Sequence, residues 1–350
     1  MRLIRPVCVS PICALLALGT SLLASPVEGA AATQAKKTSQ SSVSKPTYSA
    51  KASRDRKARL ARARAAARTR EQVRLRAVRS VQEAMTPRFK TDETGALVPD
   101  IRAAAAVIFN PDTGQVVWGE NAQDKRSIAS ITKVMTTVVF LEDNPELSQE
   151  ITVERGDVYA ASTTYLRANE RITLDNVLHL TLIASDNAAA RILARVSHGG
   201  TAAFVERMNE KALELGLENT SFADPSGLNP DNVSSAYDLS RLISFAANDE
   251  RIAPIMRTAE YRVMTNRRGF NIHSTNRLVT SGDTSVVGGK TGFIGKSGYC
   301  LATLLKLPQG NEVAVVVLGA RSNPGRFWET KHLFNWLSDK ASAILGKQPE

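Results

Sequence analysis

One serine and one lysine stand three residues apart in the segment Ala129-Ser130-Ile131-Thr132-Lys133, at the start of an apolar run with helical periodicity. Residues at positions i and i+3 share one face of a helix, so these two side chains can meet. A lysine with a depressed pKa can take the proton of a serine hydroxyl and make it a nucleophile. The spacing alone decides little, because Ser42 and Lys45 repeat it in a polar tract without helical periodicity.

Two further short elements follow in order, Ser185-Asp186-Asn187 and Lys290-Thr291-Gly292. Each is weak evidence alone, since Ser274-Thr275-Asn276 imitates the first of them. The Lys-Thr-Gly triplet occurs once, and we expect it at the end of a strand that is followed, after a turn, by another strand. Three such elements in this order are much harder to reach by chance than any single one.

The segments that must position these residues follow from hydrophobic periodicity. Two strands are expected first, then a mostly helical middle in which Thr173-Leu174-Asp175 caps a helix, then three strands and a last helix. The expected strands cover 103–109, 115–118, 285–291, 298–307 and 313–319, and the expected helices cover 130–142, 177–183, a segment ending at 196, 201–216, 237–249 and 328–345. This order predicts an α/β fold in which an antiparallel sheet is flanked by helices and carries an inserted helical lobe.

The positive charge of the chain is concentrated in one segment. The 350 residues carry a net charge of +11, but residues 36–79 alone contribute +13, from fifteen basic and two acidic residues. Residues 81–350 have a net charge of −3, so the globular part is nearly neutral. We therefore expect a basic arm at residues 33–84 followed by a catalytic domain at residues 85–350.

The N-terminus indicates export. A basic start, an apolar stretch from about Val7 to Ala24 and small residues at 30–32 are typical of a secretory signal peptide, here residues 1–32. A retained membrane anchor is the alternative, which Pro6, Pro11 and Pro26 disfavour. We expect a periplasmic protein, with or without membrane association. Removal of the signal would leave Cys300 as the only cysteine, without an intramolecular disulfide and most simply explained as a small buried strand residue.

The arm itself has two parts. Residues 33–50 are rich in Ser, Thr, Gln and Lys and are expected to be a disordered linker, whereas residues 51–84 have high helix propensity with arginine on all sides. Such an arm could bind an anionic membrane or an anionic wall polymer, or serve only as a spacer. An exported chain is not expected to bind nucleic acid.

The three elements together resemble the signature of the penicillin-binding serine D-alanyl-D-alanine peptidases, S-x-x-K, S-D-N and K-T-G. The resemblance covers roughly residues 100–340 and includes the Asp224-Pro225-Ser226-Gly227-Leu228-Asn229 loop and the Asn276-Arg277-Leu278 stretch. It implies a β-lactamase/transpeptidase-like fold, peptidoglycan stem peptides as substrates and β-lactam antibiotics as covalent inhibitors. No cofactor is implied, and His179, His198, His273 and His332 lack the spacing of metal ligands.

The resemblance also implies catalytic roles. Ser130 would be the nucleophile and Lys133 the base, with burial and the charge of Lys290 lowering the pKa of Lys133. Ser185 would relay a proton between Lys133 and the leaving amine. The backbone N–H groups of Ser130 and Phe293 would form the oxyanion hole. Without the resemblance, Ser130 would be read as a helix N-cap and residues 185–187 as an ordinary turn.

Four residues would bind substrate. Asn187 would hydrogen-bond the substrate's amide or Lys133 itself. Lys290 and Thr291 would offer a charge and a hydroxyl to the terminal carboxylate of the substrate. Gly292 would let a substrate strand lie against the strand edge. Lys290 would otherwise be an ordinary charge at a strand end.

Several activities remain compatible with this signature. The chain stops about 30 residues after its last expected strand, which favours the D-alanyl-D-alanine endopeptidases of the penicillin-binding protein 7 type over carboxypeptidases with an additional C-terminal domain. A serine β-lactamase is disfavoured, because residues 218–222 do not match the Glu-x-x-Leu-Asn pattern of the commonest class. A wall sensor that retains the pocket without catalysis is the third alternative.

Overall fold

The computed structural model describes residues 50–344. The predicted signal peptide, Cys8, Cys13 and the polar tract up to residue 49 lie outside the described residues. The chain divides into two compact units, residues 1–65 and 66–350, and the division falls within helix α1 (Ala50–Met85). None of the helices in the described part of the chain is both long and apolar enough to cross a membrane.

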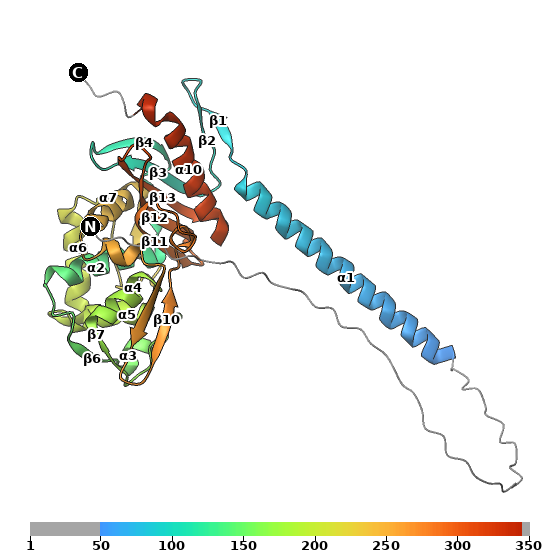
Figure 1. The fold of residues 1–350 in the computed structure, drawn as a ribbon, viewed down its shortest axis with the longest axis horizontal. Helices are drawn as coiled ribbons and strands as arrows, with labels where there is room; N and C mark the ends of the chain where they lie inside the picture. Colours follow the sequence, from blue (N-terminus) through green and yellow to red (C-terminus); the bar gives the residue numbers. More distant parts are fainter. Residues whose placement is uncertain (1–49, 345–350) are drawn as a thin grey trace, which may run out of the picture. The chain divides into compact units, whose positions relative to one another are not determined.

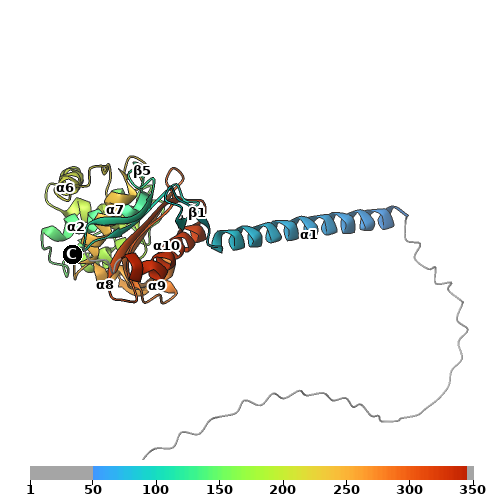
Figure 2. The same cartoon turned by 90° about the horizontal axis from the view of Figure 1, so that it is seen from above.

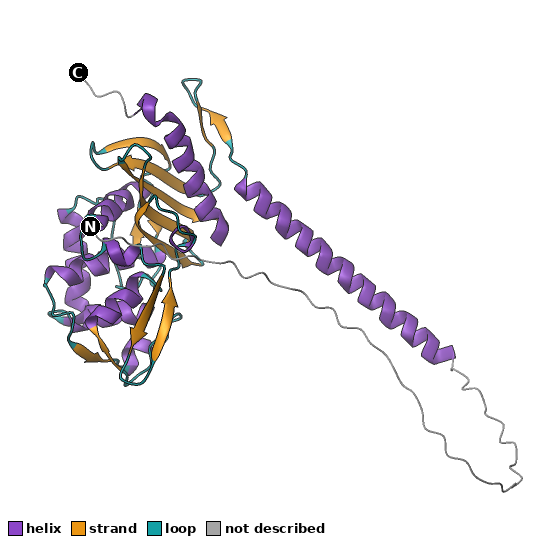
Figure 3. Cartoon of the chain, viewed as in Figure 1, coloured by secondary structure: helices purple, strands orange, loops and turns teal. Residues whose placement is uncertain are grey.

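An antiparallel sheet forms the centre of the second unit (Figures 1 and 3). Within the described residues it has five strands in the order β11-β12-β13-β3-β4, so the strand nearest the C-terminus, β13, pairs with β3, the first of the five along the chain. The strands are β3 (Ala105–Asn110), β4 (Gln115–Glu120), β11 (Val286–Ile294), β12 (Gly298–Lys306) and β13 (Glu312–Ala320). The nearly continuous apolar runs of β3, β12 and β13 suit strands that are covered on both faces.

Helices cover both faces of this sheet (Figure 2). On one face, α10 (Asn323–Ile344) packs Phe327, Leu333 and Leu337 against strand residues such as Val315. On the other face, α7 (Ala236–Ala247) packs against the sheet and joins the larger core of the helical lobe. The predicted fold class is therefore confirmed, and the edge strand β11 keeps one side free of a neighbouring strand.

The remaining elements build the helical lobe and several short antiparallel strand pairs, the first of which along the chain contacts α10. The helices are η1 (Ala129–Ile131, a 3₁₀ turn), α2 (Thr132–Glu142), α3 (Arg155–Val158), α4 (Leu174–Leu182), α5 (Asn187–Val196), α6 (Gly200–Glu214), α8 (Ala253–Met256) and α9 (Arg277–Thr280). The short strands pair as β1 (Phe89–Thr91) with β2 (Leu97–Pro99), β5 (Arg126–Ser127) with β8 (Val233–Ser234), β6 (Glu150–Thr152) with β7 (Arg171–Thr173), and β9 (Glu260–Met264) with β10 (Gly269–His273).

Three local predictions need correction. Lys290-Thr291-Gly292 lies inside β11, which continues to Ile294, because Phe293 and Ile294 still pair with β12. Ser130 lies in the 3₁₀ turn before α2 rather than in the helix proper. The last helix begins at Asn323, five residues earlier than expected, because Pro324 is tolerated in the first turn of a helix. Thr173 caps α4 by accepting a bond from the backbone N–H of Asn176, as predicted.

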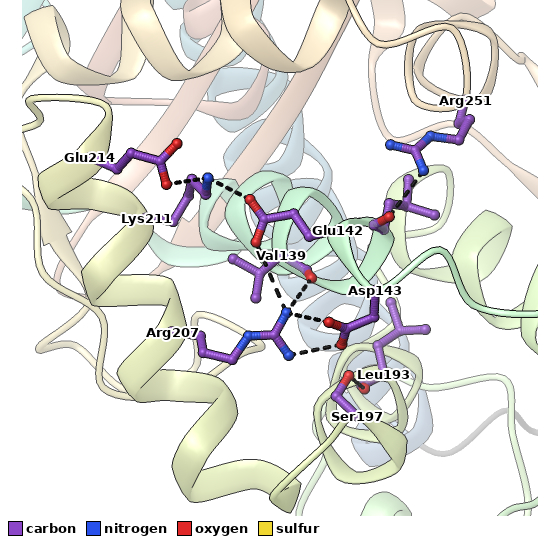
Figure 4. Close-up of polar contacts among 10 residues, drawn as sticks. Val139, Glu142, Asp143, Leu193, Ser197, Arg207, Lys211, Glu214 and Arg251 are labelled. Carbon is purple, nitrogen blue, oxygen red and sulfur yellow. Dashed lines mark hydrogen bonds and ion pairs between the residues drawn. The ribbon is translucent and has the colours of Figure 1, made fainter.

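Helix α2 is held at its C-terminal end by ion pairs from α6 (Figure 4). Arg207 donates hydrogen bonds to Asp143 at 2.8 Å and to the carbonyl of Val139 at 3.2 Å. Lys211 bridges Glu142 and Glu214. Cations at this position also complement the negative end of the helix dipole. The network therefore anchors the end of α2 that lies away from Lys133.

Candidate active site

The turn that carries Ser130 is clamped between two glycines. A Cβ atom on Gly292 of β11 would lie 2.5 Å from the carbonyl oxygen of Ile128, and one on Gly227 would lie 2.1 Å from that of Ala129. Real Cβ atoms do not approach so closely, so only glycine lets both segments pack against the turn. Gly292 thus has a packing role that the sequence analysis did not anticipate.

Lys133 is buried behind Ser130 and has three acceptors. Its Nζ atom lies 3.1 Å from Ser130 Oγ and 2.6 Å from Asn187 Oδ1, and it also donates to the carbonyl of Ser226. A neutral amine has two N–H groups and one lone pair. When the two carbonyl oxygens take the N–H groups, the lone pair is directed at the serine hydroxyl, which is the geometry that a general base needs.

The charge state of Lys133 follows from its surroundings. Complete burial lowers the pKa of Lys133 to about 7, although the carboxylates of Asp186 and Asp224 act in the opposite direction. Two positive charges assist burial: Arg191 acts on Lys133, and Lys133 and Lys290, the pair that the sequence analysis named, repel each other. A substantial fraction of Lys133 is therefore neutral near physiological pH.

The Ser185-Asp186-Asn187 turn is built by hydrogen bonds that Asp186 accepts. Its carboxylate caps α5 through the backbone N–H of Ala189 at 2.9 Å and accepts from that of Tyr165 at 2.6 Å. Ser185 adopts a left-handed backbone conformation with φ of 59°. Asn187 donates its amide to the carbonyl of Ala161 at 2.7 Å, so this side chain is oriented to present Oδ1 to Lys133.

Lys290 is buried and does not face open solvent. Its Nζ atom donates to Ser185 Oγ at 2.7 Å and to the carbonyl of Thr291 at 3.1 Å. Burial, with smaller contributions from the charges of Lys133 and Arg326, lowers the pKa of Lys290 well below its usual range. Its direct contact with a substrate carboxylate stays a prediction.

A cleft of about 470 Å³ opens in front of these residues. Its wall includes Ser130, Ser185, Asn187, Thr291, Gly292 and Phe293, whereas Lys133 and Lys290 lie fully buried. The other lining residues are Ser162, Thr163, Ala184, Leu228, Thr275, Ile294, Gly295 and Arg326. The structure thus gathers every predicted site residue at this cleft or directly behind it. No aspartate or glutamate is among the lining residues in the described part of the chain.

Three contributors were missed by sequence reasoning. The carbonyl of Ser226, an acceptor for Lys133, lies in the 224–229 loop, for which we predicted no role. Thr275 belongs to the imitation triplet 274–276, yet its hydroxyl lies 2.6 Å from that of Thr291. Arg326 comes from α10 and donates to the carbonyls of Gly292 and Cys300 at 3.0 and 3.1 Å. Burial lowers the pKa of Arg326 to about 10, so it remains charged at neutral pH.

Comparison with known proteins places this arrangement in a family. Residues 92–322 match the model of Peptidase S11, described as D-alanyl-D-alanine carboxypeptidase. The chain belongs to the Peptidase S11 family. The matched segment contains all three motifs, and the enzyme is accordingly a serine D-alanyl-D-alanine peptidase that acts on peptidoglycan.

Relatives of this S11 peptidase include both endopeptidases and carboxypeptidases. The D-alanyl-D-alanine endopeptidase of Escherichia coli strain K12 is 32% identical over 248 residues, which are 70% of this chain and 80% of that protein. The D-alanyl-D-alanine carboxypeptidase DacF of Bacillus subtilis strain 168 is 34% identical over 229 residues, 63% of this chain and 58% of that protein. The crystal structure of the Streptomyces K15 DD-transpeptidase is 28% identical, with a TM-score of 0.64 over 68% of this chain and 97% of that one.

Proposed function

We propose that this S11 peptidase is an endopeptidase that cuts the D-Ala–diaminopimelate cross-links between peptidoglycan stem peptides. The proposal is supported by the match to the Escherichia coli endopeptidase, which extends over 80% of that protein, and by a similar match to the Haemophilus influenzae endopeptidase over 73% of its length. The observation in the structure that carries it is Ser130 in the wall of a cleft lined by several hydroxyl groups, with the buried Lys133 within hydrogen-bond distance behind it.

The proposed reaction proceeds through an acyl-enzyme. Ser130 Oγ attacks the carbonyl carbon of a D-alanyl residue while its proton passes to Lys133. The N–H groups of Ser130 and Phe293 hold the oxyanion. When the tetrahedral intermediate collapses, its C–N bond breaks and Ser185 gives its proton to the leaving amine. Lys133 then passes the proton that it took from Ser130 to Ser185, so both side chains return to their starting protonation states. Water then hydrolyses the ester and restores the Ser130 hydroxyl.

We propose that the leaving residue is bound by groups that differ in part from those predicted from the sequence. Thr275, Thr291 and Arg326 line the cleft, and their two hydroxyls and one positive charge suit a free carboxylate. We propose that the buried Lys290 positions the cleft wall through its hydrogen bonds to Ser185 Oγ and to the backbone carbonyl of Thr291. Asn187 orients Lys133, and Gly292 keeps β11 close to Ser130.

Purified cross-linked muropeptide dimers test the proposal directly. Incubation with the enzyme should yield uncross-linked monomers by mass spectrometry, and the Ser130→Ala variant should yield none. Loss of a terminal D-Ala with the dimer intact would instead identify a carboxypeptidase, which is the alternative. If neither product forms while a penicillin still labels Ser130, the wall-sensor hypothesis replaces both.

We also propose that β-lactams form a long-lived adduct on Ser130. In rapid β-lactamases of the commonest class a carboxylate activates the deacylating water, and none of the described residues lining this cleft is a carboxylate. Intact-protein mass spectrometry should therefore show the penicilloyl adduct for many minutes after removal of free penicillin. Rapid turnover of nitrocefin would contradict this.

The location is proposed to be the periplasm, reached through the signal peptide expected at residues 1–32. The basic arm at residues 33–84 is proposed to hold the enzyme near an anionic surface, either a membrane or a wall polymer. Fractionation of cells that express the tagged chain should place it in the periplasmic fraction, and N-terminal sequencing should begin within a few residues of position 33. A cytoplasmic chain with an intact N-terminus would contradict export.

A further inference from the structure

Helix α1 carries a dense positive charge that the catalytic site does not use. Its 36 residues contain twelve lysines and arginines and three acidic residues, a net charge of +9. At about 1.5 Å of rise per residue the helix is roughly 54 Å long, which gives about one net positive charge for every 6 Å. Residues 86–350 have a net charge of −2, so this field belongs to the arm rather than to the catalytic domain.

These charges are exposed and largely without acidic partners. All eleven lysine and arginine residues from Arg54 to Arg79 are exposed. Among the described residues, Arg74 is the one of these eleven within ion-pair distance of a carboxylate, 3.9 Å from Glu71. Most of the arginines are therefore available to an external anion, because internal ion pairs do not neutralise them.

The helix lacks the apolar face that insertion into a membrane would use. Its large apolar side chains among the described ones are Leu60, Val73, Leu75, Val78 and Met85, with none from residue 61 to residue 72. Arg64 and Arg68 follow Leu60 at intervals of four residues, so the face that begins at Leu60 continues as a charged one. An interfacial helix needs a continuous apolar stripe to bury among lipids. The observations thus favour a hydrated polyanion over a bilayer.

We infer that α1 binds the carboxylates of peptidoglycan stem peptides and thereby tethers the enzyme to the polymer that its cleft cuts. The identity of the polymer rests on the proposed function. Arginine suits this role because its planar guanidinium recognises carboxylates in bidentate fashion and stays charged at all physiological pH values. Attachment at a second place on one polymer also raises the effective concentration of cross-links at the cleft.

Sedimentation with purified peptidoglycan sacculi tests the tether. The full chain carries Ser130→Ala, so that binding is measured without cleavage. In the test variant Arg59, Arg62, Arg64 and Arg68 are changed to glutamine, which keeps helix propensity. The matched control changes four exposed basic residues of the catalytic domain to glutamine, namely Lys125, Arg257, Arg267 and Lys306.

The helix variant should bind sacculi about tenfold more weakly than the parent at about 0.1 M salt, and the control should stay within about twofold. Binding of the parent should also weaken steeply as salt rises. Equal binding by the helix variant and the parent, or an equal loss in the control, would overturn the inference. So would binding to vesicles of phosphatidylglycerol and phosphatidylcholine in equal parts but not to sacculi.

The experiments distinguish a failure of the tether from a failure of the proposed endopeptidase activity. With Ser130 present, the four-arginine variant should cut soluble cross-linked dimers at the parental rate, because a soluble substrate reaches the cleft without attachment of the enzyme to the polymer. If the parent cuts no dimers while its Ser130→Ala form still binds sacculi through the arginines, the activity is wrong and the tether stands. If it cuts dimers but ignores sacculi, the tether is wrong.

Discussion

Lys290 Nζ donates a hydrogen bond to Ser185 Oγ at 2.7 Å, so the serine of the second motif is bound by the lysine of the third. In a second pair, Lys133 Nζ lies 3.1 Å from Oγ of Ser130, which lines the same cleft. Both lysines are buried, and burial lowers both pKa values. We propose that these two lysine–serine pairs together remove the proton from the nucleophile and deliver a proton to the leaving group.

The rate of Ser130 acylation should depend on pH through Lys133. The pKa of Lys133 is lowered to about 7 by burial, and only the neutral amine can accept the serine proton. The rate of labelling by a fluorescent penicillin should thus fall about tenfold per pH unit below that value and level off above it. Lys133→Arg keeps the positive charge and should abolish labelling at every pH. A flat profile between about pH 5 and 8 would show that Lys133 is not the base.

Gly292→Ala should damage the site through packing. The new Cβ would lie 2.5 Å from the carbonyl oxygen of Ile128, so either β11 or the Ser130 turn must move. We expect penicillin acylation to slow about a hundredfold, since displacements near 1 Å have that effect, and the free energy of unfolding to fall by about 1–3 kcal/mol.

Gly295→Ala is the matched control for this substitution. It lies three residues further along and also lines the cleft, but nothing is within 4 Å of its Cβ position. Acylation and thermal unfolding of this variant should stay close to the parental values. Similar rates for the two alanine variants would mean that contact between β11 and the Ser130 turn does not position the nucleophile.

Thr275→Val should weaken recognition of a terminal carboxylate. The substitution keeps the shape of the side chain and removes the hydroxyl that lies 2.6 Å from Thr291 Oγ1. Steady-state cleavage of a peptide with a free C-terminus should show KM raised about tenfold, equivalent to about 1.4 kcal/mol, with kcat nearly unchanged.

Two comparisons separate this effect from a general disturbance. Thr280→Val removes an exposed hydroxyl that bonds to the carbonyl of Arg277, outside the cleft, and should leave KM unchanged. A C-terminally amidated peptide should show no difference between the parent and Thr275→Val. An equal rise in KM for both peptides would exclude a carboxylate-binding role for Thr275.

Much of the fold could be predicted from the sequence, and so could the three motifs that meet at the cleft. Apolar runs and turn residues located the five sheet strands, because strands covered on both faces show long apolar segments. The motifs at 130–133, 185–187 and 290–292 could be found because their side chains carry the chemistry. All of them meet at one cleft or directly behind it.

The other residues that shape the site could not be identified from the sequence. Any residue type can supply a carbonyl, so the role of Ser226 O depends on how the 224–229 loop folds against Lys133. Arg326 reaches the cleft from a helix that packs on the far face of the sheet, a contact that periodicity does not reveal. Lys290 is buried because other segments pack over β11, and the sequence does not reveal that packing. Burial in turn affects how this side chain can act on a substrate.

Arg207→Gln should lower stability without slowing acylation. It removes the ion pair with Asp143 and the bond to the carbonyl of Val139, both at the end of α2 remote from Lys133. The Arg207 side chain is 25% exposed, so after allowance for solvent screening we expect a loss of about 1 kcal/mol and a Tm lower by about 2–4 °C. Arg171→Gln breaks a pair with Glu150 at 3.7 Å whose side chains are more than half exposed, and its Tm should barely change. Differential scanning calorimetry would measure both variants beside penicillin labelling. Equal Tm values for the two variants would mean that the ion pairs of α2 do not stabilise the fold. Slower labelling in Arg207→Gln alone would mean that they position the nucleophile.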